Sequence, residues 1–372
     1  MSKSNKKRKK KIAVLPLIFA VLSGVLAGFM YRATYVLDIH SGYRFIIIFA
    51  SVLISIPIVT VIHEGGHLVF GLLTGYKFSS FRIMSFMWVK ENEKIKFRRH
   101  KIVGTGGQCL MAPPPLKDGK MPIVLYNFGG AILNAITALV CFILFFIYPN
   151  PLFVAPAVLS LFYALQNGVP IHTEMIDNDG YNALSLGKNP EAMRAFWTQL
   201  SVMELQTREV RLCDMPAEWF YMPSDDAVRN SLVATNGVFY CNRLMDEGRF
   251  EDTDAAIAHL LALESGIVGL HRNLLLCDRI FCELIGEGRL NVVDGYMSTE
   301  LKNFMLSMKS FPSVIRTEYV YALLYERNED KANRALERFV KVGEKYPYKS
   351  DLNSERELMD IALKKYKETL TI

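Results

Sequence analysis

Hydrophobic residues are unevenly distributed along the chain. Four long apolar stretches, at about residues 12–31, 45–74, 122–148 and 151–169, lie in its first half. Each is long enough to cross the roughly 30 Å hydrocarbon core of a bilayer as an α-helix. After residue 187 the apolar positions recur with helical periodicity among polar ones, as in a soluble domain. The pattern predicts a mainly α protein, with a membrane domain over residues 12–186 and a soluble domain over residues 187–372.

The segment between the second and third apolar stretches, residues 75–121, follows a strand pattern. Two strand-like runs, Phe78–Val89 and Lys94–Ile102, lie on either side of Glu91-Asn92-Glu93. They predict a small β-hairpin at the membrane surface. The run Gly104–Gly107 lacks the Lys-Ser/Thr ending of a phosphate-binding loop, so we predict no nucleotide site there.

The soluble half repeats a short motif. Met245–Phe250 (MDEGRF) recurs after 40 residues as Ile285–Leu290 (IGEGRL), and more loosely as Tyr325–Asp330. Each copy lies between two helical patterns, as in helix hairpins stacked at a fixed period. The spacing favours an α-solenoid similar to tetratricopeptide repeats, and the alternative is an irregular helical bundle.

Charge indicates the topology of the predicted spans. The net charge is +6, and basic residues concentrate in segments 1–11 and 75–121, whereas the link from Tyr31 to Tyr43 carries only Arg32 and Asp38. By the positive-inside rule, both termini and segment 75–121 are cytoplasmic in a multi-pass protein of the cell membrane. The N-terminal basic run borders apolar sequence and no nucleic-acid motif follows it, so we predict no nucleic-acid partner.

The strongest chemical signal is His63-Glu64-Gly65-Gly66-His67, an HExxH motif near the inner end of the second apolar stretch. On a helix, residues four apart share a face, so both imidazoles can bind one metal ion while the glutamate faces a water. Without a partner, these groups are costly to bury in a membrane. A metal site is therefore favoured over histidines in a polar gap, and the two glycines are expected to allow close helix approach.

A catalytic zinc site commonly has three protein ligands and one open position. Candidates for the third ligand cluster just after the fourth apolar stretch, namely His172, Glu174, Asp177 and Asp179. Composition alone does not choose among them.

On these residues, the chain resembles the site-2 protease family of intramembrane zinc metalloproteases. Besides the HExxH motif, the resemblance rests on Gly129–Asn134 (GGAILN), which is similar to the family's Gly-Pro-x-x-x-Asn element with the proline replaced, and on Asn167–Pro170 (NGVP) followed by Asp179-Gly180. It covers residues 45–186.

The resemblance implies a metalloendopeptidase with one Zn²⁺ per chain. Glu64 is then the catalytic base, and the metal ligands are His63, His67 and Asp179. The Asp-Gly pair lies farther from the proline than is usual in the family, so Asp177 is the alternative third ligand. The resemblance also implies that Asn134 and Asn167 hold substrate backbone or an oxyanion, and the alternative is that they only hydrogen-bond between helices.

A protease of this kind would cut a membrane-embedded or membrane-tethered protein or peptide. In bacteria such enzymes typically release a tethered regulator or trim a signal or pheromone peptide. The hairpin edge could hold the extended substrate, and the soluble domain could bind a regulator, a substrate tail or a second copy. The alternatives are a hydrolase for soluble peptides and a non-proteolytic membrane receptor or scaffold acting through the repeats. Glu64 argues against the receptor, because a structural metal site needs no base.

Overall fold

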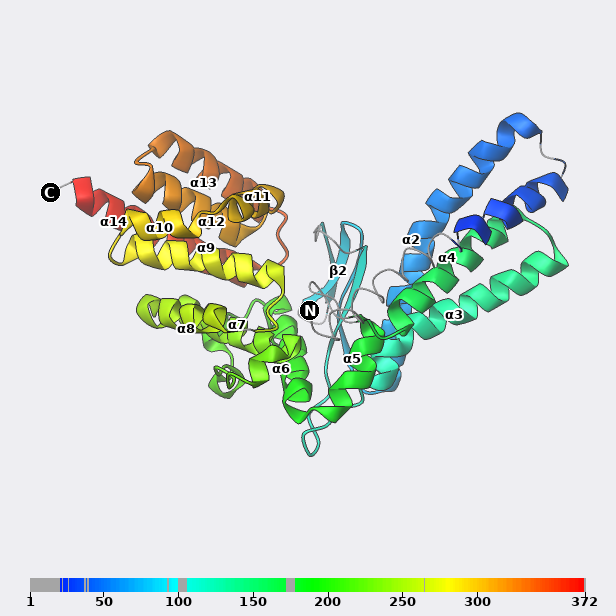
Figure 1. Cartoon of the computed structure of the whole chain (residues 1–372), viewed down its shortest axis with the longest axis horizontal. Helices are drawn as coiled ribbons and strands as arrows, with labels where there is room; N and C mark the ends of the chain where they lie inside the picture. Colours follow the sequence, from blue (N-terminus) through cyan, green and yellow to red (C-terminus); the bar gives the residue numbers. More distant parts are fainter. Residues whose placement is uncertain are drawn as a thin grey trace, which may run out of the picture.

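The computed structural model describes residues 21, 23–25, 27–36, 38, 40–91, 94–99, 106–171, 178–263 and 265–370. Its elements are mainly helices, with one small antiparallel sheet between two helical regions (Figure 1). The predicted fold class is confirmed at this level.

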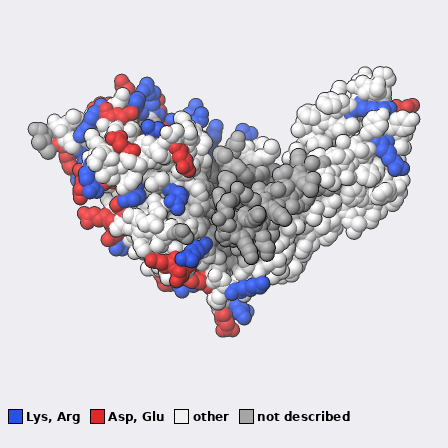
Figure 2. Space-filling view, viewed as in Figure 1, with Lys and Arg blue, Asp and Glu red and all other residues white. Residues whose placement is uncertain are grey.

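The apolar helices form one arm of the molecule. They are α2 (Ser41–Leu73), α3 (Val124–Ile147) and α4 (Pro151–Gly168). Among the described residues, α2 and α3 are long and apolar enough to cross a membrane, and α4 is apolar but shorter. Figure 2 shows that this arm carries charged side chains mainly near its tip. The surface therefore suits contact with lipid, because hydrocarbon excludes charge.

The first predicted span is only partly described. Most of residues 21–36 are helical, whereas the part of the span before residue 21 lies outside the described residues. Two of the four predicted spans thus meet the length and hydropathy expected of a membrane helix. Four spans stay a prediction.

The segment after α2 folds as a four-stranded sheet. The strands are β1 (Lys77–Ile83), β2 (Phe86–Glu91), β3 (Lys94–Arg99) and β4 (Gly107–Ala112), in the spatial order β3-β2-β1-β4. β-structure was expected here, but the run Phe78–Val89 is two strands, which turn at Met84 with a left-handed φ of 54°. The sequence signal for this turn is weak because it contains no glycine or proline. β4 lies on the outer side of β1.

The remaining helices form the C-terminal region. They are α5 (Asp179–Ser185), α6 (Pro190–Thr207), α7 (Ser231–Asp246), α8 (Phe250–Ala262), α9 (Gly269–Ile285), α10 (Leu290–Tyr296), α11 (Thr299–Ser307), α12 (Pro312–Val320), the π-helix η5 (Tyr321–Tyr325), α13 (Glu329–Gly343) and α14 (Lys349–Leu370), with four 3₁₀ turns, Leu186–Lys188, Leu212–Asp214, Ala217–Trp219 and Ala227–Arg229.

The repeated motif marks the turns between helices. Gly248 joins α7 to α8 and Gly288 joins α9 to α10, with φ of 73° and 70°, a region that glycine enters without strain. In the third copy Arg327 adopts φ of 54° before α13. The regular solenoid stays a prediction, because α10 is short and α11 follows it before the next helix pair.

Helix α6 attaches the C-terminal region to the sheet. A shared hydrophobic cluster contains Tyr76, Met111, Tyr126 and Phe196, from the link between α2 and β1, from β4, from α3 and from α6. The Trp197 indole donates to the Pro114 carbonyl at 3.0 Å. One hydrophobic core therefore joins the sheet and α3 to α6, the helix at the start of the C-terminal region.

A buried ion-pair cluster lies in the core of the C-terminal region. The Arg316 side chain is 1 % exposed, and its guanidinium donates to Asp278 and, at 2.8 Å, to Glu355. The remaining Nη1 donates to the Cys277 carbonyl at 3.3 Å. Every charge in this cluster has a partner within the cluster, which links α9, α12 and α14.

Candidate metal centre and catalytic site

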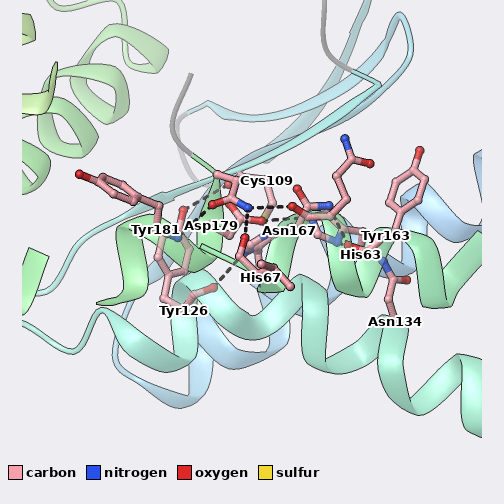
Figure 3. Close-up of polar contacts among 12 residues, drawn as sticks. His63, His67, Cys109, Tyr126, Asn134, Tyr163, Asn167, Asp179 and Tyr181 are labelled. Atoms are coloured by element: carbon pink, nitrogen blue, oxygen red, sulfur yellow. Dashed lines mark hydrogen bonds and ion pairs between the residues drawn. The ribbon is translucent and has the colours of Figure 1, made fainter. Parts of the chain in front are cut away.

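The HExxH residues lie on α2 as the sequence predicts. His63, Glu64 and His67 are all buried. Asp179, the first residue of α5, lies beside the two histidines (Figure 3). Its Oδ2 lies 3.3 Å from the Nε2 atoms of both histidines, which are 3.3 Å from each other. The structure therefore brings the predicted third ligand to the two imidazoles.

The other third-ligand candidates, His172, Glu174 and Asp177, lie outside the described residues. Among the described residues, His63, His67 and Asp179 form the one group of three whose donor atoms could hold a metal ion.

The spacing of these donor atoms fits zinc. Two imidazole nitrogens and one carboxylate oxygen are zinc ligands, and bonds of about 2.0–2.1 Å in a tetrahedron place ligand atoms roughly 3.3 Å apart. The observed separations are 3.3 Å. The donor set thus fits a zinc ion with one position left open.

Both histidines have partners for their second ring nitrogen. His67 Nδ1 lies 2.8 Å from the Tyr126 carbonyl oxygen, which can only accept, so Nδ1 donates and Nε2 keeps its lone pair for a metal. His63 Nδ1 lies 3.1 Å from the Asn134 amide on α3. The Oδ1 atom of Asn134 is buried without a hydrogen-bond partner among the described residues. If the amide oxygen and nitrogen of Asn134 exchange places, Oδ1 accepts a hydrogen bond from His63 Nδ1. The lone pair of His63 Nε2 is then also available for a metal.

The two predicted asparagines therefore have different surroundings. Asn134 contacts a candidate metal ligand across the α2–α3 interface, which matches the interhelical alternative. The Asn167 amide donates at 3.0 Å to the Tyr163 carbonyl within α4, and it is only half-buried.

Small residues allow the helices to meet at the site. A Cβ on Gly66 would lie 2.2 Å from the carbonyl oxygen of Gly129, so α2 and α3 touch through their backbones. A Cβ on Gly130 would lie 2.5 Å from the His63 ring and 2.7 Å from His67 Nε2. The expected close approach is confirmed for Gly66 but wrong for Gly65, which has open space beside it.

Asn178 fixes the position of Asp179 and was missed by the sequence reasoning. Its Oδ1 accepts from the backbone of Ile171 at 2.9 Å and of Tyr181 at 3.0 Å. Its amide donates to the carbonyls of Gln166 and Val169. Asn178 thereby caps α5 and ties it to the end of α4. An asparagine directly before a helical pattern is an N-cap signal that could have identified it.

Strand β4 lies against Glu64. A Cβ on Gly107 would lie 2.6 Å from Glu64 Oε1, so the strand passes directly beside the carboxylate. β4 pairs with β1 on one side. The start of β4, at Gly107, is in contact with the candidate catalytic base.

Comparison with known proteins agrees with this geometry. No curated protein and no solved structure matched the chain. The model of peptidase family M50, the site-2 protease family, matches residues 51–346, which include the HExxH motif and Asp179. The match covers most of the chain and confirms the resemblance drawn from the motifs. The chain therefore belongs to peptidase family M50, a family of membrane metallopeptidases.

Proposed function

We propose that this protein is an intramembrane zinc endopeptidase that cleaves a membrane-embedded or membrane-tethered protein or peptide. The convergence of His63, His67 and Asp179 beside Glu64 carries the proposal. Family membership supports metallopeptidase activity. The position of the HExxH motif on α2, the longest apolar helix described, supports a substrate that is reached at the membrane.

The chemistry follows from the residues around the centre. Zinc bound by these ligands supplies Lewis acidity, which activates water and polarises a peptide carbonyl. Glu64 accepts a proton from the attacking water as the new C–O bond forms. The same carboxyl then donates that proton to the amide nitrogen as the C–N bond breaks. The Tyr126 carbonyl holds His67 in the tautomer that binds metal, and Asn134 does the same for His63 when its amide oxygen faces that ring.

Strand β4 is the element best placed to receive the substrate. A substrate helix has its carbonyls hydrogen-bonded and must become extended before a peptide bond can be attacked. The edge of the expected hairpin is β3, at the opposite side of the sheet, whereas β4 lies against Glu64. Pairing with β4 would present an extended segment to the base.

A crosslinking experiment tests this arrangement. We expect a photoreactive side chain at Gln108 in β4 to capture substrate in the Glu64→Gln protein, and one at Lys96 in β3 to capture little. Equal capture at both positions would contradict a role for the β4 edge.

We extend the proposal to the orientation of the protein in the membrane and to its biological role. The basic segments predict that both termini are cytoplasmic. Bacterial processing of a tethered regulator or of a signal or pheromone peptide fits an enzyme with its site near the cytoplasmic end of α2.

The Glu64→Gln variant tests the function directly. It keeps all three candidate ligands, so we expect the purified protein to retain zinc while an uncleaved membrane protein or peptide accumulates in cells. Quantitative membrane proteomics and metal analysis measure the two outcomes. Retained zinc with no accumulating substrate under any condition would favour the receptor or scaffold instead.

A further inference from the structure

A groove opens in the C-terminal region, in the lobe farthest from the membrane helices (Figure 1). It lies between α11 and α13, with η5 at its base, and has a volume of about 560 Å³. Its floor is apolar and contains Met297, Met305, Ala322 and Ala335. Leu306, on the α11 wall, leaves 69 % of its surface exposed. An exposed leucine next to a methionine-containing floor suits binding of apolar side chains, because methionine adapts to varied shapes.

The charged side chains around this floor are mainly basic. They comprise four basic residues, Lys302, Lys331, Arg334 and Arg338, and two acidic residues, Glu318 and Glu326. Both acidic groups are paired within the groove, Glu326 with Lys331 at 3.0 Å and Glu318 with Arg338. Lys302 and Arg334 are exposed and have no ion-pair partner among the described residues. They extend from opposite walls, α11 and α13, so the groove has an excess of two positive charges.

The base of the groove has an unusual backbone. Residues Tyr321–Tyr325 form a π-helix, a conformation often found at functional sites. The rings of Tyr321 and Tyr325 stack at 4.4 Å, and the Tyr325 hydroxyl donates to Asp294 at 2.5 Å. These contacts hold the Tyr321 side chain at the groove lining.

We infer that this groove binds an acidic amphipathic segment of another protein. Apolar side chains of the segment pack on Met305, Leu306 and Ala322, and carboxylates beside them pair with Lys302 and Arg334. Two helices that form the walls of an apolar groove are a common setting for an amphipathic helix. The inference adds a partner site to the proposed protease and does not depend on catalysis.

The probe is a labelled peptide of roughly 14 residues, long enough for several helical turns. It carries leucines at one-turn spacing with glutamates beside them, and a twin peptide carries lysines in place of the glutamates. Binding to the full-length protein in nanodiscs is followed by fluorescence anisotropy. The Glu64→Gln protein is measured in parallel and is expected to bind equally, so a failure of the proposed protease function would not affect this result.

Charge reversal locates the site. We expect Lys302→Glu with Arg334→Glu to weaken binding of the acidic peptide by at least about fivefold, since attraction becomes repulsion at both walls. The matched control is Lys309→Glu with Lys345→Glu, which changes the net charge equally at exposed positions outside the groove. Leu306→Ser is expected to weaken binding about fivefold by removing the apolar contact. Higher salt should weaken the acidic peptide's binding.

Three results would overturn the inference. The acidic peptide could fail to bind the wild-type protein, the lysine twin could bind as tightly, or the groove and control variants could lose affinity equally. Thermal unfolding of each variant shows whether a loss of binding reflects a loss of folding.

Discussion

The membrane arm and the C-terminal region both bury ionisable side chains, with opposite consequences. In the C-terminal region Arg316 lies between two carboxylates, Asp278 and Glu355, so positive and negative charge are both present. At the end of α2, imidazole nitrogens and the carboxylate of Asp179 converge with donor atoms 3.3 Å apart. In the first cluster each charged group has an oppositely charged partner within the cluster. The second leaves its lone pairs directed at a common point, which is the arrangement that a cation completes.

Because of this difference, we expect substitutions in the first cluster to affect folding stability and substitutions near the second to affect function. Removing a member of the first cluster leaves an unpaired buried charge, which lowers the free energy of unfolding. Changes around the convergent cluster should instead reduce zinc binding and proteolysis. Substitutions at four positions test this contrast.

The largest expected effect is on stability at Arg316. Arg316→Ala leaves Asp278 and Glu355 buried without their counter-charge, so we expect a loss of about 3–5 kcal/mol in the free energy of unfolding. Chemical denaturation followed by tryptophan fluorescence measures the loss, and bound zinc in the protein that remains folded should be unchanged. The exposed Arg334→Ala serves as the control, with an expected change within about 0.5 kcal/mol. Equal stability of the two variants would show that the cluster is not structural.

The next effect concerns Gly130. A methyl group there would meet both imidazoles, so we expect Gly130→Ala to lower zinc affinity by about 100-fold by displacing the ligands. Competition with a zinc chelator measures the affinity. Gly65→Ala is the matched control on α2, because it adds a methyl group in open space and should leave affinity unchanged. Similar affinity in both variants would contradict the assigned packing of α3 on the ligands.

A pH-dependent effect is expected at Asp351 on α14. Burial, together with the nearby charge of Glu355, raises the pKa of the Asp351 carboxyl to about 7, although Gln206 donates to it at 3.1 Å. An unfolded aspartate titrates near pH 4, so between about pH 4 and pH 7 ionisation favours the unfolded state and stability falls as pH rises. Asp351→Asn removes this loss, and we expect a gain of about 2 kcal/mol at pH 8. Thermal unfolding should show no gain at pH 4, and a gain independent of pH would disprove the explanation.

The smallest expected effect distinguishes two roles of Asn134. If its amide orients His63, Asn134→Ala should lower zinc affinity by about tenfold, and Asn134→Asp, which keeps an acceptor, should lower it less. The control is Thr137→Ala on the same helix, whose hydroxyl donates to the Leu133 carbonyl of that helix at 2.9 Å. Unchanged zinc affinity with a raised KM would instead support substrate binding by Asn134.

Some parts of the fold could be predicted because their signals are local. The apolar lengths of α2 and α3 follow from hydropathy, and the repeated EGR motif marks turns at Gly248 and Gly288. Other parts lacked a local signal. The turn at Met84 has no glycine or proline, so the sequence predicts one strand-like run, Phe78–Val89, where the structure has β1 and β2. Glycine is uncommon in strands, yet Gly107 begins strand β4 beside Glu64.

The order of the residues alone is enough to place His63, Glu64 and His67 on one helical face, because residues one turn apart are adjacent on any α-helix. It also determined that this face belongs to an apolar helix. Only the tertiary structure brought Asp179 to these imidazoles, placed Asn134 and the Tyr126 carbonyl behind them, and put β4 against Glu64. The physical reason is that helical periodicity fixes neighbours within one helix. Contacts between helices depend on how closely their backbones pack, which here was decided by Gly66 meeting Gly129.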